Sequence, residues 1–169
     1  MKSGSKISVF VLSLCLGVLG LSDAVFAAAN RVSGKAIPRF VSLRDEEISL
    51  RTGPGGRYPT EWVYKKPALP VEVIAEHDVW LRIRDPQGTL GWVKRTSVSS
   101  KRTVFVSAAN TKMYSEMSLS SGVVANIESG AIGQIESCES VWCKIKFPEA
   151  KGFMLKSEIW GVYDEEILD

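Results

Sequence analysis

Two cysteines near the C-terminal end, Cys138 and Cys143, are the residues whose type and spacing most directly suggest chemistry. If residues 139–142 form a four-residue hairpin loop, the two cysteines face each other across antiparallel strands. Opposed Cβ atoms then lie roughly 4.5–5.5 Å apart, close to what a disulfide can bridge. We therefore expect a structural disulfide that pins one hairpin, with free thiols and a redox pair as the alternatives.

The chain offers little else for metal binding or catalysis. A metal site needs about four ligands, and the single histidine, His77, lies in a predicted turn in the other half of the chain. The sequence contains no Gly-x-Ser-x-Gly, no His-Glu-x-x-His and no glycine-rich phosphate loop ahead of a helix. It therefore predicts a protein that is not an enzyme and uses no metal or cofactor. A buried carboxylate beside His77 in a cleft would favour the opposite.

The first 27 residues have the layout of a secretory signal peptide. Lys2 and Lys6 precede an apolar run at residues 7–21, and small residues follow it. Cleavage is predicted after Ala27 or after Ala29. The apolar run of 15 residues is shorter than the ~20 that a membrane-spanning helix needs. We expect a periplasmic or secreted protein with no stable membrane insertion after cleavage.

This segment has two other interpretations. One is an uncleaved anchor. The other is lipidation at Cys15, which is disfavoured because the bulky Leu14 stands where a small residue is expected and the apolar run continues past the cysteine. Signal cleavage would remove Cys15 and leave Cys138 and Cys143 as the cysteines of the mature chain.

Short β-patterned runs begin at residue 40 and occur twice. Residues 79–83 match residues 141–145, and Gly91 matches Gly152, at an offset of 61–62 residues. No long stretch after the signal peptide has helical periodicity, so the fold class is all-β. An offset of this length suits a small barrel. The predicted organisation is a linker at 28–39, domains at 40–103 and 104–161, and an acidic C-terminal tail at 162–169.

Charge is distributed unevenly between the halves. The net charge of the whole chain is +2, which argues against a nucleic-acid partner. Residues 31–103 carry 14 basic and 8 acidic side chains, a net charge of +6, whereas residues 104–169 carry 5 basic and 10 acidic ones, a net charge of −5. Three explanations of this uneven charge remain open: incidental drift, attraction between the domains, and a basic face that meets an anionic partner.

Several segments together resemble a bacterial SH3 (SH3b) domain. They are Ser-Leu-Arg-Thr-Gly-Pro-Gly at residues 49–55, an apolar hairpin, and Gly-Trp-Val at residues 91–93. With residues 39–43 and 160–163, the order of motifs is similar to a tandem SH3-like family of exported proteobacterial proteins, over nearly the whole mature chain. The resemblance implies two small SH3-like β-barrels in tandem.

An SH3-like barrel offers a groove lined by aromatic rings, between its long loop and the next hairpin. The candidate groove residues are Arg51, Tyr58, Trp62, Trp80, Arg82 and Trp92. Trp80 alternates with Leu81 and Ile83, so it should face away from them and is the best tryptophan candidate for the groove. The alternatives are a structural role for the rings and a solvated face for the arginines.

The family resemblance implies a binding module that is often directed at cell-wall peptide or glycan. We therefore expect a non-enzymatic exported module for peptidoglycan or envelope peptides. The alternative is an envelope scaffold that contacts another protein through its oppositely charged domains.

Overall fold

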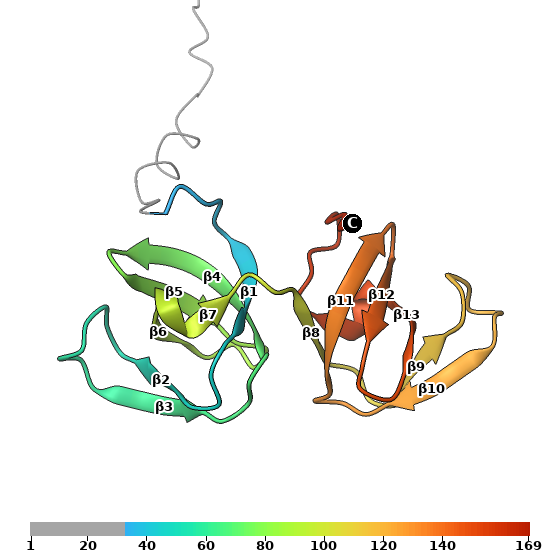
Figure 1. Ribbon diagram of the computed structural model, residues 1–169, viewed down its shortest axis with the longest axis horizontal. Helices are drawn as coiled ribbons and strands as arrows, with labels where there is room; N and C mark the ends of the chain where they lie inside the picture. Colours follow the sequence, from blue (N-terminus) through green and yellow to red (C-terminus); the bar gives the residue numbers. More distant parts are fainter. Residues whose placement is uncertain (1–32) are drawn as a thin grey trace, which may run out of the picture.

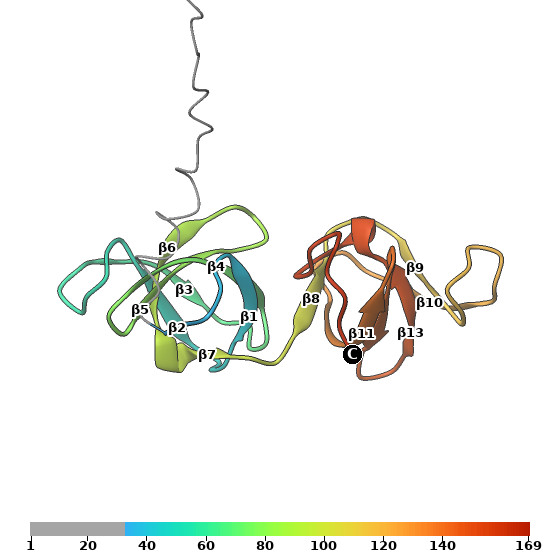
Figure 2. The ribbon, with the colours of Figure 1, turned by 90° about the horizontal axis from the view of Figure 1, so that it is seen from above.

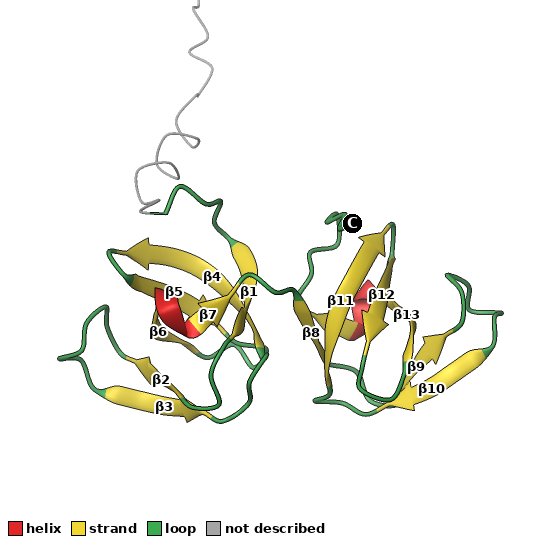
Figure 3. Ribbon diagram, viewed as in Figure 1, coloured by secondary structure: helices red, strands yellow, loops and turns green. Residues whose placement is uncertain are grey.

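The computed structural model describes residues 33–169, and regular structure in this part of the chain is almost entirely β-strand (Figure 1, Figure 3). The first domain contains β1 (Arg39–Leu43), β2 (Ile48–Arg51), β3 (Thr60–Tyr64), β4 (Pro70–His77), β5 (Trp80–Arg84), β6 (Leu90–Lys94) and β7 (Val98–Ser99). The second domain contains β8 (Thr103–Val106), β9 (Thr111–Tyr114), β10 (Val123–Ile127), β11 (Ile132–Glu139), β12 (Trp142–Lys146), β13 (Lys151–Leu155) and β14 (Ile159–Trp160). Single 3-10 turns, η1 (Arg95–Ser97) and η2 (Lys156–Glu158), precede β7 and β14.

The signal peptide and its cleavage sites, predicted within residues 1–29, lie outside the described residues. Within residues 33–169, no helix has the length and apolar character needed to cross a membrane.

The two domains have the same topology. Their seven-stranded sheets run in the orders β3-β2-β6-β5-β4-β1-β7 and β10-β9-β13-β12-β11-β8-β14, which are identical position by position. Figure 2 shows the domains side by side, joined by the segment between β7 and β8. Val73 pairs with Ile83 in the first sheet as Ile135 pairs with Ile145 in the second. The predicted all-β class and internal repeat are confirmed.

Each domain has its own hydrophobic core. In β5 the side chains of Leu81 and Ile83 are fully buried, whereas Arg82 between them is exposed. This alternation places every second residue of a strand on the core face. Cys143 and Ile145 occupy the same positions in β12 and are also fully buried.

The domain limits differ slightly from the predicted ones. β1 begins at Arg39 and β8 at Thr103, each one residue before the predicted starts at 40 and 104. Thr103 already pairs with Gln134 of β11, so it belongs to the second sheet. Its hydroxyl also donates a hydrogen bond of 2.7 Å to the carbonyl oxygen of Ala68 in the first domain. The second domain therefore contacts the first from its first residue.

Cys138 and Cys143 form the predicted disulfide, with their Cα atoms 4.1 Å apart. The predicted four-residue loop between them is wrong. The pair next to the cysteines also matches in register, which leaves a turn of two residues, Ser140 and Val141. Ser140 has φ of 49°, because two-residue hairpin turns need left-handed backbone to follow the twist of the strands.

The last eight residues, predicted to be an acidic tail, pack against the second domain. Leu168 and Cys138 exchange backbone hydrogen bonds of 2.8 and 3.0 Å. The buried Lys156 donates from Nζ to the carbonyl oxygens of Asp164 and Glu166, both at 2.8 Å. A buried ammonium needs such acceptors, so the segment completes the fold instead of extending into solvent.

Aromatic rings join the two domains. Phe40 in β1 meets Trp160 edge-on at a centroid distance of 4.8 Å and Tyr163 at 4.6 Å. The guanidinium of Arg102 lies 5.8 Å from the centroid of the same ring. Such ring pairs add to the free energy of burial, so this cluster fixes how the end of the chain sits on the first domain.

Candidate ligand-binding surfaces

Trp80 is buried, which corrects its prediction as a groove residue. As predicted from the alternation, it lies on the opposite face of β5 from Leu81 and Ile83, yet only 7% of it is exposed. Its register partners are His77 and Lys94, whose side chains flank it on that face. Trp142, the same position in the second domain, is buried too. Trp80 is therefore a structural residue.

Arg51 and Tyr58 hold the long loop between β2 and β3. The Arg51 guanidinium donates to the carbonyl oxygens of Tyr58 at 2.7 Å and Gly56 at 3.3 Å. The Tyr58 ring lies so close to Gly53 that a Cβ there would come within 2.4 Å of it. The guanidinium of Arg51 is thus already hydrogen-bonded to backbone carbonyl oxygens. The ring of Tyr58 covers the backbone of Gly53.

Arg51, Trp92 and Arg82 form a row across three strands. Trp92 in β6 pairs with Arg82 on one side and with Arg51 on the other, so the three side chains share one face. Arg82 is exposed and Trp92 is half-buried. The His77 ring stands edge-on to Trp92 at 6.5 Å. The structure therefore brings together three of the predicted groove residues, and Tyr58 adjoins them through Arg51.

Trp62 lies elsewhere. It pairs with Leu50 in β2, yet it extends past the core and is 58% exposed. It lines a cavity of about 660 Å³, named here the Trp62 cavity, which lies between the first domain and Phe105 and Gly130 of the second. Other residues of this cavity include Tyr64, Lys65, Lys66, Asp85 and Phe105. An exposed indole beside two lysines combines a stacking face with positive charge.

A buried hydrogen bond forms one wall of the Trp62 cavity. The Tyr64 hydroxyl donates to Oδ2 of Asp85 at 3.0 Å, and Oδ1 accepts from the backbone N–H groups of Gln87 at 3.0 Å and Thr89 at 2.7 Å. Burial raises the pKa of Tyr64, and the negative charge of Asp85 and their hydrogen bond raise it further. Both carboxylate oxygens are thus satisfied within the protein, and Asp85 orders the turn before β6.

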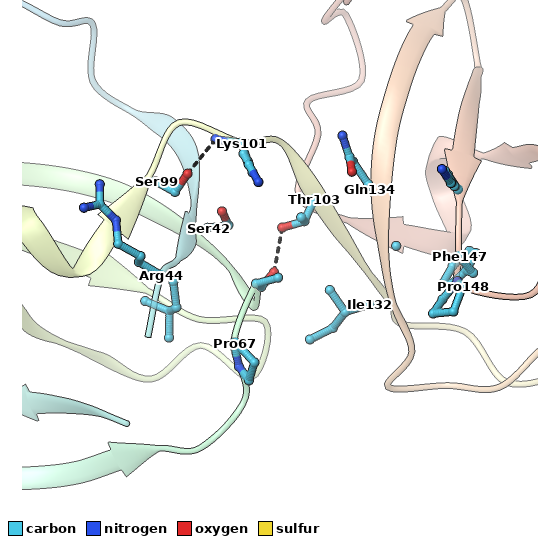
Figure 4. A pocket seen from close by; sticks show the side chains of 14 residues that line it. Ser42, Arg44, Pro67, Ser99, Lys101, Thr103, Ile132, Gln134, Phe147 and Pro148 are labelled. Atoms are coloured by element: carbon cyan, nitrogen blue, oxygen red, sulfur yellow. Dashed lines mark hydrogen bonds between the residues drawn. The ribbon is translucent and has the colours of Figure 1, made fainter. Parts of the chain in front are cut away.

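A second cavity, of about 680 Å³, also lies between the two domains (Figure 4). We name it the interdomain cleft. Its polar and charged lining includes Ser42, Arg44, Lys101, Thr103, Gln134 and Lys146. Figure 4 shows Ser42 and Arg44 on the side of the first domain, Gln134 and Phe147 on the side of the second, and Lys101 on the connecting segment.

Sequence reasoning missed the interdomain cleft. Its three cations, Arg44, Lys101 and Lys146, are far apart along the chain and belong to no motif. The only available signal was the excess of basic residues over acidic ones at 31–103. The packing of one domain against the other brings these side chains to one place.

The geometry around His77 offers no acid–base pair. The side chain is exposed at the end of β4, and its ring stands edge-on to that of Trp92. Among residues 33–169, no group of three His, Cys, Asp or Glu side chains is placed to hold a metal ion. Cys138 and Cys143, the cysteines of this described part of the chain, form the disulfide.

Residues 44–100 and 107–161 each match the family described as the bacterial SH3 domain. The two matches each cover one structural domain, and they start 63 and end 61 residues apart, close to the spacing of the sequence repeat. A protein of Bacillus subtilis (strain 168) named "Putative N-acetylmuramoyl-L-alanine amidase YrvJ" is 25% identical over 157 residues. That match covers 86% of this chain but only 29% of the relative, so the chain spans less than a third of its length.

Two solved structures, of NlpC2 and NlpC1 from Trichomonas vaginalis, are also similar. Each is 12% identical, with TM-scores of 0.34 and 0.35. The matches cover 73% and 77% of this chain and 48% of each of those chains.

Proposed function

Because the chain belongs to the bacterial SH3 domain family, we propose that it is an exported, non-enzymatic binding module for cell-wall peptidoglycan or envelope peptides. The relative named as an amidase supports a wall ligand, since N-acetylmuramoyl-L-alanine is a unit of peptidoglycan. The predicted signal peptide at residues 1–27 supports a periplasmic or secreted location.

The observation that carries this proposal is the exposure of Trp62 above a cavity that also contains Lys65 and Lys66. Tryptophan is enriched at binding interfaces, because its ring offers a large apolar face that can stack on a sugar or a peptide. Peptidoglycan supplies both a glycan chain and peptide carboxylates, which suit the ring and the lysines respectively. Arg82 and Trp92 form a second candidate contact on the outer face of the same domain.

The surroundings of the two candidate acid–base residues, Asp85 and His77, support a binding role without catalysis. Asp85 has both oxygens hydrogen-bonded within the protein, and His77 is exposed. A general base needs a free lone pair within hydrogen-bond reach of the substrate proton. Asp85 is instead held by Tyr64 and two backbone N–H groups, and among residues 33–169 no carboxylate forms an ion pair with His77.

Co-sedimentation with purified peptidoglycan sacculi tests the proposal. The chain from residue 28 should sediment with sacculi, and Trp62→Ala should reduce the bound fraction by at least about fivefold. Leu119→Ala is the matched control, because Leu119 is 64% exposed but lies on the second domain. Binding that survives moderate salt supports a built site, whereas binding lost by moderate salt indicates a nonspecific basic surface.

The second candidate function is an envelope scaffold that contacts another protein. The uneven charge of the halves favours it, as do the exposed apolar side chains of Met117, Leu119 and Val124 on the β9–β10 hairpin. No sedimentation at any salt concentration would contradict the wall-binding proposal and favour the scaffold.

A further inference from the structure

The lining of the interdomain cleft is positively charged. It contains Arg44, Lys101 and Lys146, and no Asp or Glu lies among the described residues that line it. Within residues 33–169, no carboxylate lies within 4.0 Å of these three cations. Arg44 lies at the margin of the cleft, where its guanidinium donates to the carbonyl oxygen of Val98 at 3.1 Å. Lys101 and Lys146 line the cleft without a counter-charge, which favours an anionic occupant.

The repeat shows what the second domain lacks at this position. In the first domain Glu72 of β4 lies opposite Arg84 of β5. At the same register position of the second domain Gln134 lies opposite Lys146, and both line the cleft. The carboxylate of the first domain is therefore replaced by a neutral amide, while the cation is kept.

In the first domain that carboxylate is fully used. Glu72 is buried, accepts from Nε of Arg84 at 2.8 Å, and also accepts from the hydroxyl of Tyr163 at 2.9 Å. The pair is thus closed by a side chain from the end of the protein. The matching surface of the second domain is open to the cleft, so a ligand can reach Lys146 and Gln134 there.

Apolar side chains form another part of the lining. Ile132, Phe147 and Pro148 of the second domain face Leu43 and Pro67 of the first. A volume of about 680 Å³ is within the range of small-molecule and short-peptide sites. The cleft thus suits a carboxylate attached to a small apolar group.

We propose that the interdomain cleft binds a peptide carboxylate, which takes beside Lys146 and Gln134 the place that Glu72 holds beside Arg84. Lys101, on the segment that connects the domains, supplies further positive charge. Lys146 binds the carboxylate as an ammonium donor, and the Gln134 amide N–H donates to its second oxygen. This inference rests on the proposed function only in taking the ligand to be a peptide.

The test is a titration followed by NMR amide shifts, with N-acetyl-alanyl-alanine as the probe and its C-terminal amide as the uncharged comparison. A single carboxylate contact should bind in the millimolar range. The backbone amides of residues 101, 134 and 146 should shift, and the amidated probe should bind at least tenfold more weakly. Equal affinity for the two probes, or shifts confined to other surfaces, would overturn the proposal.

Two variants sharpen the test. Lys146→Gln should weaken binding of the free carboxylate about five- to tenfold, whereas Lys112→Gln, an exposed lysine on β9 outside the cleft, should not. Gln134→Glu restores the carboxylate found in the first domain, so it should neutralise Lys146 and abolish binding. Asn126→Asp adds the same charge on the exposed part of β10 and serves as its control.

The outcome is separable from that of the proposed function. Gln134→Glu leaves Trp62 untouched, so sedimentation with sacculi reports on the Trp62 cavity and the dipeptide titration reports on the cleft. If Gln134→Glu and Lys146→Gln bind the probe as the unmodified chain does, the cleft proposal is wrong whatever the sacculi show.

Discussion

The hydroxyl of Tyr163, near the end of the chain, donates a hydrogen bond of 2.9 Å to Oε1 of Glu72 in the first domain. This contact joins residues that are 91 positions apart. It closes the Glu72–Arg84 ion pair and lies beside the cluster of rings around Phe40. We call this set of contacts, from Tyr163 to Glu72 and to Phe40, the joint between the domains. Because each domain is small and has a thin core, contacts at the joint couple the stabilities of the two domains.

Replacing Tyr163 with phenylalanine should uncouple the domains. The change removes a hydrogen bond to a charged group, at a cost of about 1.5 kcal/mol, and keeps the ring on Phe40. We expect thermal unfolding, followed by calorimetry, to separate into two transitions or to broaden. Tyr114→Phe is the control, because its hydroxyl has no hydrogen bond within residues 33–169. An unchanged single transition in Tyr163→Phe would contradict the coupling.

Acid should weaken the same joint through Glu166. Burial alone raises the pKa of Glu166, but the hydrogen bonds from Arg102 and the Tyr163 backbone outweigh it and hold the pKa below its ordinary value of 4.5. A lowered pKa in the folded state means that the ionised form stabilises the fold above about pH 4.5. That stabilisation is lost as the pH falls through the lowered pKa.

The measurement is the free energy of unfolding in urea between pH 7 and pH 3. Glu166→Gln should lower it at pH 7 and flatten its fall in acid. The exposed neighbour Glu165 provides the control, since Glu165→Gln should leave the curve as it is. Parallel curves for Glu166→Gln and the unmodified chain would exclude this role.

Reducing the disulfide should loosen one hairpin and spare the fold. The closed loop between Cys138 and Cys143 is short, so the cross-link contributes about 2 kcal/mol by the chain-entropy model. Hydrogen exchange should accelerate at the β11–β12 turn and at Leu168, which pairs with Cys138. Amides of β4 and β5, the matching hairpin without a disulfide, are the internal reference. Global unfolding on reduction would contradict this assignment.

Local sequence pattern predicted the strands and the repeat, because both depend on neighbours a few residues apart. The alternation around Leu81 and Ile83 gives their burial directly, and the five-residue spacing of the cysteines gives the disulfide. Alternation also gave the face on which Trp80 lies, but it could not show that this face of the ring is covered.

Contacts between residues far apart in the chain could not be predicted from the local sequence pattern. The acidic residues at the C-terminal end were predicted to form a tail. Their partners, Arg102 and Lys156, lie in other elements, so the local sequence contained no sign of these contacts. The interdomain cleft depends on how two folded domains meet, and no local motif records that. The six candidate groove residues were chosen by residue type. In the fold they occupy four different places: a buried position on β5, the loop between β2 and β3, the row across β2, β6 and β5, and the Trp62 cavity.

Truncating the buried Trp80 and the exposed Trp62 should have different effects on stability and on wall binding. Trp80→Ala removes a buried ring and should destabilise the first domain by about 3–5 kcal/mol. Trp62→Ala removes a ring that is 58% exposed, so the midpoint of thermal unfolding should change little while wall binding falls. Circular dichroism melts paired with sedimentation would check both. Large destabilisation by Trp62→Ala would mean that the ring supports the fold.

Gly161 offers a test of the joint that involves no side chain. It has φ of +124°, and a Cβ there would lie 2.4 Å from the carbonyl oxygen of Thr103 and 3.2 Å from Cβ of Pro70. The oxygen belongs to backbone that cannot move away easily. Gly161→Ala must therefore displace β8 or separate the end of the chain from the first domain.

Gly130 is the matched control for this change. It also has positive φ, at +88°, but a Cβ there meets nothing within 4 Å. Gly130→Ala should cost only the backbone strain of about 1–2 kcal/mol. Gly161→Ala should cost distinctly more and should also raise hydrogen exchange at Tyr163, because the displaced segment carries the residue that binds Glu72. Equal costs for the two variants, measured by urea unfolding, would show that the close approach at Gly161 does not hold the domains together.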